Sequence, residues 1–332
     1  MITSSSLAAT DVLVSRLSFG AAPIGSLFAP VSDEQAHETV QAAWDAGIRT
    51  YDTAPHYGLG VSERRLGEIL RERPRHSYTL STKVGRLLEP YDGGGDDLAA
   101  GGFAVPATHR RVWDFSEDGV RRSIEGSLER LGLDRVDIVY LHDPDDHEEW
   151  AFREGYPALE KLRSEGVVGA IGAGMNQAEM LTRFITDTDT DVVLAAGRYT
   201  LLDQISLEAL LPEAQARGKS VVAAAVYNSG VLADPRPGST YNYTTAPDDL
   251  LNRALRIKAL AEDHGTTLRA AALAFPLAHP AVASVLVGMR SADQVRDTAR
   301  QFATPVPAAF WAALKSEGLL AADVPVPGEA TA

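Results

Sequence analysis

Four polar residues in the first half of the chain belong to types that together can move a proton to or from an oxygen. Asp52 and Tyr57 share one short segment, and Lys83 and His142 follow the next two strand-like apolar runs. A phenol ordinarily has a pKa of about 10, and a nearby ammonium favours its ionised form. Lys83 can bring that charge to Tyr57, while Asp52 orients the lysine by an ion pair. The set therefore predicts a general acid and base for interconverting a carbonyl and an alcohol, with His142 either hydrogen-bonding the reacting oxygen or relaying a proton.

Each of these residues alone has a plainer explanation. Asp52 can cap a turn, Tyr57 can be a turn aromatic, and Lys83 can be a surface lysine. His142 can begin a hydrogen-bonded loop, since Asp and Pro follow it. The combination is far more specific, because all four stand at the carboxyl ends of three successive predicted strands.

The elements that must position these residues alternate short apolar runs with amphipathic stretches. A helix predicted over residues 116–131, for example, carries its apolar side chains on one face. Eight runs read as strands, each followed by helix, which predicts an α/β fold of the closed (β/α)8 type, a TIM barrel. An open doubly wound sheet is the alternative, but no strand leads into a full GxGxxG turn. The predicted strands are residues 13–20, 48–52, 78–84, 136–141, 167–173, 191–195, 220–225 and 284–287.

Two long connections follow the third and the seventh predicted strands, at residues 86–114 and 233–248. Both lie on the side where barrel enzymes build their sites, so each is either a substrate lid or a merely mobile insertion. We expect one barrel domain over residues 1–332, structured from about residue 11 to residue 318. A flexible tail is expected over residues 324–332, which are rich in Pro, Gly and Ala.

The composition limits the classes of partner. The chain has 332 residues, 45% of them hydrophobic, and a formal net charge of −14, which disfavours nucleic acid and anionic membranes. It has no cysteine and hence no thiolate ligand, and we expect no metal. We find no signal-peptide pattern and no membrane-spanning stretch. We expect a cytoplasmic protein that acts on a small molecule, as a monomer or a weak homo-oligomer.

The chain resembles the aldo-keto reductase superfamily over nearly its whole length. The resemblance rests on residues 17–22, 52–58 and 287–291. It implies a (β/α)8 barrel that binds NAD or NADP across the carboxyl ends of the strands. It also implies that the four residues introduced above are a catalytic tetrad, with Tyr57 as the acid and base.

Further segments are similar to the branch of this superfamily that holds L-fucose, D-threo-aldose, L-galactose and pyridoxal 4-dehydrogenases. They are residues 121–132, 141–145, 172–177, 196–203 and 227–230. This similarity implies oxidation as the physiological direction, in which the anomeric carbon of an aldose becomes a lactone. Oxidation of pyridoxal and general reduction of aldehydes or ketones are alternatives. A nucleotide-binding regulator and a lyase with a Schiff-base lysine are others, which the complete tetrad disfavours.

Candidate cofactor contacts lie at strand ends around the predicted barrel. Small residues after the first strand let backbone approach a nicotinamide, and the turn after the seventh has amides and a hydroxyl for a pyrophosphate. The last helix begins at a natural anion site, but Asp293 and Asp297 repel a 2′-phosphate, so we favour NAD over NADP. Tyr199 and Tyr227 are candidates for stacking on the nicotinamide or for core packing. The candidates are Gly20, Ala21, Asp52, Asn176, Tyr199, Tyr227, Asn228, Ser229, Gly230, Leu232, Gly288, Met289, Arg290, Ser291 and Gln294.

Candidate substrate contacts surround the reacting oxygen. Aromatic surfaces suit the apolar faces of a pyranose or a pyridine ring. Such rings can come from the connection after the first strand and from the long connection after the third. The candidates are Phe28, His56, Tyr57, Trp113 and His142.

Overall fold

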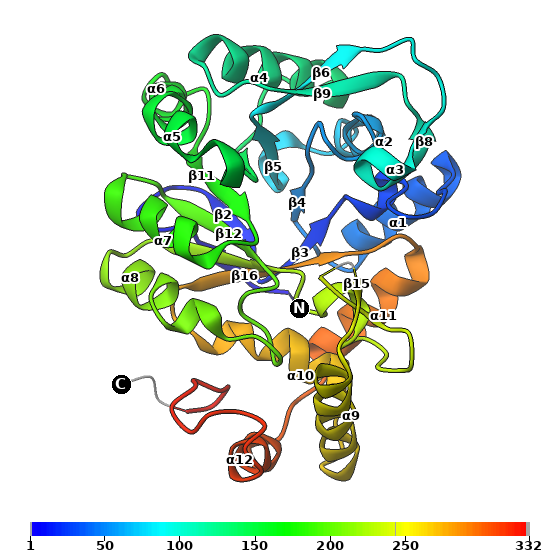
Figure 1. Ribbon diagram of the computed structural model, residues 1–332, viewed down its shortest axis with the longest axis vertical. Coiled ribbons are helices and arrows are strands. Elements are labelled where there is room, and N and C mark those ends of the chain that lie inside the picture. The colour runs from blue at the N-terminus through cyan, green and yellow to red at the C-terminus, as the bar shows by residue number, and fades with distance from the viewer. Residues whose placement is uncertain (1, 243, 330–332) are drawn as a thin grey trace.

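Eight parallel strands close into a barrel in the computed structural model, which describes residues 2–242 and 244–329. Each strand pairs with the next along the chain, and the last pairs back to the first. Figure 1 shows the strands around the centre and helices outside them. The predicted (β/α)8 fold is therefore confirmed. The strands are β3 (Leu17–Gly20), β4 (Thr50–Asp52), β5 (Thr79–Val84), β10 (Ile138–His142), β11 (Ala170–Met175), β12 (Val192–Ala196), β13 (Ser220–Ala224) and β16 (Val282–Gly288).

Helices cover the outside of the barrel through their apolar faces. The side chains of Ser32, Ser116 and Ser291 each accept a hydrogen bond from a backbone amide in the first turn of a helix, as N-caps do. Gly132, at a φ of 63°, ends α4 in the left-handed conformation. The helices are α1 (Asp33–Asp45), α2 (Val61–Leu70), α4 (Glu117–Leu131), α5 (Glu148–Trp150), α6 (Tyr156–Ser164), α7 (Ala178–Asp187), α8 (Leu210–Ala216), α9 (Asp248–Asp263), α10 (Leu268–Ala274), α11 (Ala292–Ala303) and α12 (Ala308–Ser316).

Alternation along the strands divides the core into two layers. Inside the barrel, residues such as Tyr140, Leu194 and Leu286 form one hydrophobic cluster. Between the barrel and the helices, residues such as Phe19 and Tyr51 form a larger one. Because side chains fill the barrel, its interior is a packed core and not a channel.

An antiparallel hairpin closes the amino-terminal end of the barrel. Its strands are β1 (Ser4–Ser6) and β2 (Leu13–Ser15). Leu7 and Val14 are buried in the same cluster as Ile138, which begins β10. The single strand predicted over residues 13–20 is interrupted at Arg16, and only its second half joins the barrel. With this end closed, the carboxyl ends of the strands form the accessible face.

The connection after β5 contains regular secondary structure, although its glycine-rich sequence is typical of a loop. Its outer strands pair antiparallel and lie at the top of Figure 1, and Gly102 O accepts a 2.8 Å hydrogen bond from Phe28 N in the connection after β3. We call residues 86–114 the insertion. The connection after β13 contains a shorter antiparallel pair. These elements are β6 (Arg86–Pro90), β7 (Asp96–Asp97), α3 (Leu98–Gly101), β8 (Phe103–Pro106), β9 (His109–Trp113), β14 (Thr240–Tyr241) and β15 (Thr244–Thr245).

The chain after α12 packs back onto the barrel. Val324 and Val326 are buried in the main cluster, where the flexible tail was predicted to begin. Lys315 Nζ lies 2.7 Å from Glu329 Oε2. The last residues of that predicted tail, 330–332, lie outside the described residues. Each helix in the described part of the chain is too short or too polar to cross a membrane.

Candidate active site

Lys83 on β5 contacts both predicted catalytic residues of the neighbouring segment, Asp52 at the end of β4 and Tyr57 in the connection after it. Its ammonium donates hydrogen bonds to Asp52 Oδ2 at 2.6 Å and to the Tyr57 hydroxyl at 3.0 Å. The strand register places Asp52 beside Ser81, whose hydroxyl donates to Asp52 Oδ1 at 2.8 Å. The side chains of Lys83 and Asp52 are only 2% and 5% exposed, so their ion pair is shielded from solvent.

The electrostatics of this cluster keep Lys83 charged and Tyr57 protonated. Burial disfavours the ammonium, but Asp52 and Tyr57 outweigh it and raise the pKa of Lys83. Burial raises the pKa of Tyr57 to about 12, and Lys83 opposes that increase. We expected Lys83 to lower the phenol pKa overall. The effect of the lysine has that sign, but burial, which spacing alone does not reveal, is larger.

His142 ends β10 and presents its ring to the same cluster. The centroids of the His142 and Tyr57 rings are 5.6 Å apart, and the ring planes are perpendicular at 90°. Burial, followed by the charges of Arg86 and Lys83, lowers the pKa of His142 well below its ordinary value. The imidazole is therefore neutral and can donate a hydrogen bond to a substrate oxygen without carrying charge. The four predicted residues thus lie together at one end of the barrel.

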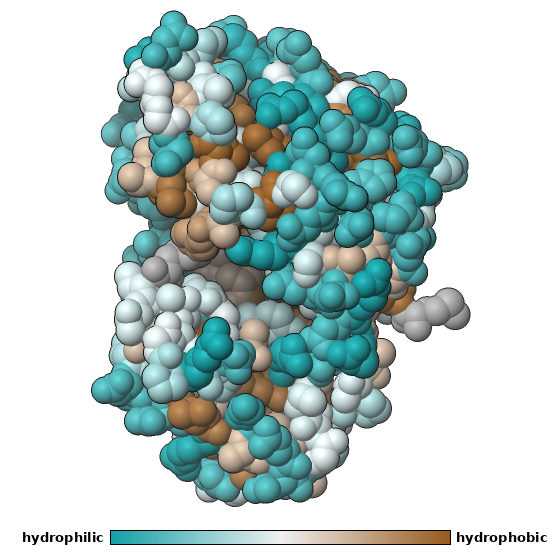
Figure 2. Space-filling model, turned by 90° about the vertical axis from the view of Figure 1, so that its right-hand side faces the viewer, coloured by the Kyte–Doolittle hydropathy of each residue, from teal (hydrophilic) through white to brown (hydrophobic). Residues whose placement is uncertain are grey.

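Two cavities meet at Tyr57. The first has a volume of about 470 Å³ and runs from Asp52 to β16 and α11. The second has about 490 Å³ and is bounded by His56, His142 and the insertion. Figure 2 shows a largely hydrophilic surface with a hollow near its middle whose floor is hydrophobic. Because the phenol lines both cavities, it can contact a reacting atom at the boundary between a ligand in the first cavity and a ligand in the second.

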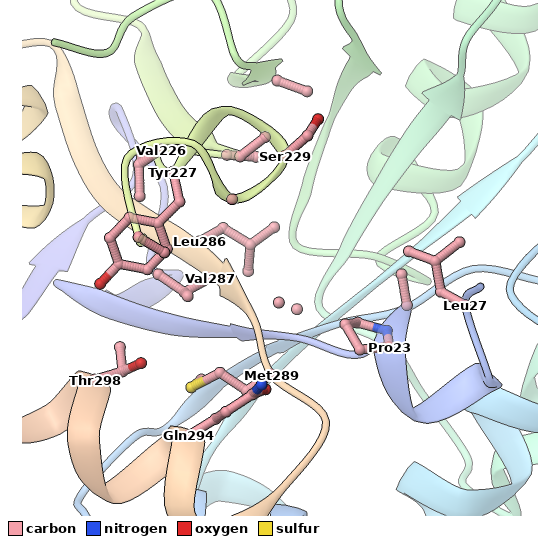
Figure 3. Close-up of a pocket in the computed structure, with 18 of the residues that line it drawn as sticks. Pro23, Leu27, Val226, Tyr227, Ser229, Leu286, Val287, Met289, Gln294 and Thr298 are labelled. Carbon is pink, nitrogen blue, oxygen red and sulfur yellow. The ribbon is translucent and has the colours of Figure 1, made fainter. Parts of the chain in front are cut away.

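The residues of the first cavity fit an elongated, partly apolar cofactor. Gly20 and Gly288 are neighbours in the register of β3 and β16 and both line it. A Cβ on Gly288 would lie 3.0 Å from Pro23 Cγ, so this wall has little room for a side chain and exposes backbone. Tyr227 adds an aromatic ring, and Figure 3 shows its hydroxyl pointing toward Thr298 on α11.

The structure brings part of the predicted cofactor set to this cavity. Asn176 lines the second cavity instead. The predicted residues that line the first are Gly20, Asp52, Tyr227, Ser229, Gly230, Gly288, Met289 and Gln294. Those that line neither are Ala21, Tyr199, Asn228, Leu232, Arg290 and Ser291.

The residues outside both cavities have other contacts. Tyr199 is 1% exposed and its ring centroid lies 5.0 Å from that of Phe275, so it is a core residue. Asn228 is buried and its Nδ2 donates to the carbonyl of residue 197 at 3.3 Å. Arg290 donates to the carbonyl of Leu27 at 2.9 Å, and Ser291 caps α11. Ala21 and Leu232 are fully buried.

All but one of the predicted substrate residues line the second cavity. Those that line the second cavity are Phe28, His56, Tyr57 and His142. Trp113 does not line the second cavity, and its ring stacks on Phe115 with centroids 5.8 Å apart. The guanidinium carbon of Arg86 lies 4.5 Å from the centre of the Trp113 ring. Trp113 therefore packs against residues next to the site without facing the substrate space.

Two residues of the insertion belong to the site although their sequence context did not reveal them. Phe103 lines the second cavity, with its ring centroid 5.3 Å from that of His56. Arg111 Nε donates a hydrogen bond to His56 Nδ1. The signal for Phe103 was an aromatic residue in a glycine-rich segment on the active side of the barrel. Arg111 gave no signal, because one arginine among several has no distinguishing pattern.

The sequence matches the Aldo/keto reductase family over residues 16–317. The protein belongs to this family. It is 46% identical over 329 residues to a D-threo-aldose 1-dehydrogenase from a Pseudomonas species, with 96% of this chain and 98% of the relative covered. It is 40% identical to the pyridoxal 4-dehydrogenase of Microbacterium luteolum, covering 95% and 97% of the two chains. An L-galactose dehydrogenase from Arabidopsis thaliana is 33% identical, with 87% and 84% covered.

Solved structures of other aldo-keto reductases have the same architecture. An aldo-keto reductase from Bacillus halodurans in its holo form superposes with a TM-score of 0.77 at 26% identity, covering 98% of both chains. The protein is therefore an oxidoreductase enzyme of a family that uses NAD(P)H. The predicted family and branch are confirmed by the three relatives.

Proposed function

We propose that this aldo-keto reductase oxidises the anomeric carbon of an aldose, in its cyclic form, to the lactone. The observation that carries the proposal is the position of Tyr57, which lines both cavities and contacts Lys83 at 3.0 Å. A phenol at that junction can exchange a proton with a substrate hydroxyl in the second cavity. The substrate carbon that bears this hydroxyl then faces the first cavity. The similarity to a D-threo-aldose 1-dehydrogenase over nearly the whole chain supports the choice of substrate.

The chain's own residues handle the proton. Tyr57 accepts the proton of the anomeric hydroxyl as the carbonyl of the lactone forms. Lys83 stabilises the phenolate form of Tyr57 that accepts this proton, and Asp52 fixes the lysine by the 2.6 Å ion pair. His142, neutral and buried, donates a hydrogen bond that orients the reacting oxygen. The residues of the first cavity would hold NAD(P)+, which would supply the hydride acceptor for the anomeric carbon.

The charges around the second cavity suit a neutral sugar. Among the described residues that line it, Lys83 is the one lysine or arginine, and its charge is already paired with Asp52. Asp143, which is paired with Arg86, and Asp145 also line it, and one buried carboxylate oxygen of Asp145 has no hydrogen-bond partner in the described structure. Carboxylates accept hydrogen bonds from sugar hydroxyls and repel phosphates and carboxylates. We therefore propose unphosphorylated aldoses as substrates.

We propose NAD as the cofactor, because Arg269, Arg296 and Arg300, on or near α11, are already paired with carboxylates. Asp297 accepts hydrogen bonds from Arg269 and Arg300. Asp293 Oδ1 lies 2.8 Å from Arg296 Nη1. A 2′-phosphate would have to compete with these carboxylates, whereas a ribose hydroxyl would not.

A substrate panel tests the proposal. The purified enzyme is mixed with L-fucose, D-arabinose or L-galactose and with NAD+ or NADP+, and absorbance is followed at 340 nm. We expect turnover of at least one aldose, faster with NAD+, and none of an aldose phosphorylated away from the anomeric carbon, such as D-arabinose 5-phosphate. Pyridoxal belongs in the same panel, because the relative at 40% identity oxidises it by name. If the enzyme oxidises pyridoxal rapidly and turns over no aldose, the proposed function is wrong and the protein is a pyridoxal dehydrogenase.

A further inference from the structure

His56 lines the second cavity and is held there by a residue of the insertion. Arg111 Nε donates a hydrogen bond to His56 Nδ1, and Arg111 Nη2 donates to the His56 carbonyl at 3.0 Å. Asp97 holds the same guanidinium through both of its oxygens, at 2.7 and 2.6 Å. We call Arg111 and Asp97 the clamp. The Asp97 side chain is 4% exposed and that of Arg111 is 16% exposed, so the clamp is shielded from solvent.

This contact determines which nitrogen of His56 carries the proton. A guanidinium has five N–H donors and no acceptor, and it does not lose a proton in proteins. His56 Nδ1 must therefore offer its lone pair, and the proton of the neutral ring is on Nε2. Burial, together with the charges of Arg86 and Arg111, lowers the pKa of His56 to about 2. The imidazole stays neutral, with a fixed tautomer.

The described residues offer no hydrogen-bond acceptor to the Nε2–H of His56, whose ring lines the second cavity, whereas its Nδ1 has a partner. The ring lies among the groups that act on the substrate. Its centroid is 5.5 Å from that of His142 and 6.0 Å from that of Tyr57. Phe103 packs edge-on against it, at 5.3 Å and 89°, which holds the ring in place. His56 is only partly buried, so water can satisfy this donor in the free enzyme, and a ligand that displaces the water must bring an acceptor of its own.

We propose that His56 donates its Nε2–H to a second substrate oxygen, on the carbon next to the reacting carbon. The proposal rests on the function proposed above and makes the 2-hydroxyl of the aldose the group that is recognised. Tyr57 and His142 act on the anomeric oxygen, and the three rings surround a space in which the neighbouring substituent faces the third ring. A substrate with only hydrogen at that carbon would leave the donor unpaired. Arg111 and Asp97 are then positioning residues that act through His56.

The test compares an aldose that the enzyme oxidises with its 2-deoxy analogue. For the wild type we expect kcat/KM to be roughly ten-fold or more higher for the parent sugar, the effect of one buried hydrogen bond. His56→Phe keeps the ring and removes the donor, so the ratio between the two sugars should fall to about two-fold or less. The change in ratio between the two enzymes cancels the different intrinsic reactivity of the two sugars.

Arg111→Met tests the clamp with the same ratio. Loss of the arginine frees the tautomer of His56, so we expect the preference for the parent sugar to shrink, whereas a purely structural defect would lower both activities equally. Arg110→Met is the matched control. Arg110 lies next in the chain, but it is 65% exposed and contacts Glu89, and its removal should leave the ratio unchanged.

Two negative outcomes are distinguishable. If the wild type oxidises an aldose but the ratio is the same in wild type and His56→Phe, recognition by His56 is overturned and the proposed function stands. If Arg111→Met keeps the wild-type ratio, the positioning role of Arg111 and Asp97 is overturned, and the proposed function again stands. If the wild type oxidises no aldose at all, the proposed function fails and this inference fails with it.

Discussion

The Lys83 ammonium donates a 3.0 Å hydrogen bond to the hydroxyl of Tyr57, which comes from the connection after the neighbouring strand. The lysine is anchored independently of the tyrosine, because it also contacts Asp52 Oδ2 and the Thr53 carbonyl at 3.0 Å. Its charge therefore stays in place whether the phenol is protonated or ionised. A cation fixed in advance stabilises the phenolate form of Tyr57 without reorganisation.

Tyr57→Phe should lower kcat for aldose oxidation by roughly 10³-fold, the usual contribution of a positioned acid or base. Only the contact with Lys83 is lost, so binding of NAD should change little. Steady-state rates at 340 nm measure the first effect, and titration of protein fluorescence with NAD measures the second. Retention of a tenth of the activity would exclude Tyr57 as the acid and base.

Lys83→Met should reduce both activity and stability. The substitution leaves the carboxylate of Asp52 buried without its counter-charge, which typically costs about 3–5 kcal/mol. Urea denaturation measures the loss. The double variant with Asp52→Asn should regain most of the stability, because no charge is then left unpaired, but it should remain inactive. Equal stability of the wild type and the single variant would contradict the importance of the ion pair.

Aldose oxidation should become faster as the pH rises. Tyr57 must be ionised to accept a proton, and its pKa of about 12 leaves only a small phenolate fraction at neutral pH. Over pH 7–10 we expect kcat/KM to rise by about ten-fold per pH unit, the slope of a single ionisation. A deuterium label on the anomeric carbon checks that hydride transfer limits the rate. A plateau already below pH 8 would show that another group is the base.

The protein should lose stability as the pH falls from about 6.5, the ordinary pKa of histidine. His56 and His142 have lowered pKa values in the folded state, so the unfolded chain binds protons first. Their contribution is fully present above that pH and declines below it, by roughly 1.4 kcal/mol per pH unit for each histidine. Unfolding at pH 6.5, 6.0 and 5.5 measures the slope. His56→Phe should make it shallower by that amount, and an unchanged slope would contradict the neutral state of His56.

The cofactor preference should depend on Asp297. In the wild type we expect kcat/KM to be higher with NAD+ than with NADP+. Asp297→Asn releases Arg269 and Arg300 from a carboxylate and should raise kcat/KM for NADP+ several-fold. Asp187→Asn, which removes an exposed carboxylate from α7, controls for the change in net charge. A preference that moves equally in both variants would mean that only overall charge matters.

The sequence was sufficient to predict the barrel and the residues that cluster around Tyr57. Parallel strands end on one face, so polar residues at the ends of successive strands must meet there. Tyr199 was ambiguous, because an aromatic residue after a strand can face a cavity or the core, and packing against Phe275 decides it. Arg111 could not be found at all. Its partner His56 lies 55 positions earlier, and only the pairing of β6 with β9 brings the two together.

The insertion separates two properties of this enzyme. The four residues proposed as catalytic come from the barrel strands and the turns that follow them, whereas Asp97, Phe103 and Arg111 come from a segment outside the closed barrel. Reactivity and substrate choice can then change independently in evolution. Exchange of residues 86–114 between two relatives would transfer selectivity while leaving the proton-transfer apparatus as it is, so this segment is the natural unit for grafting or for directed evolution.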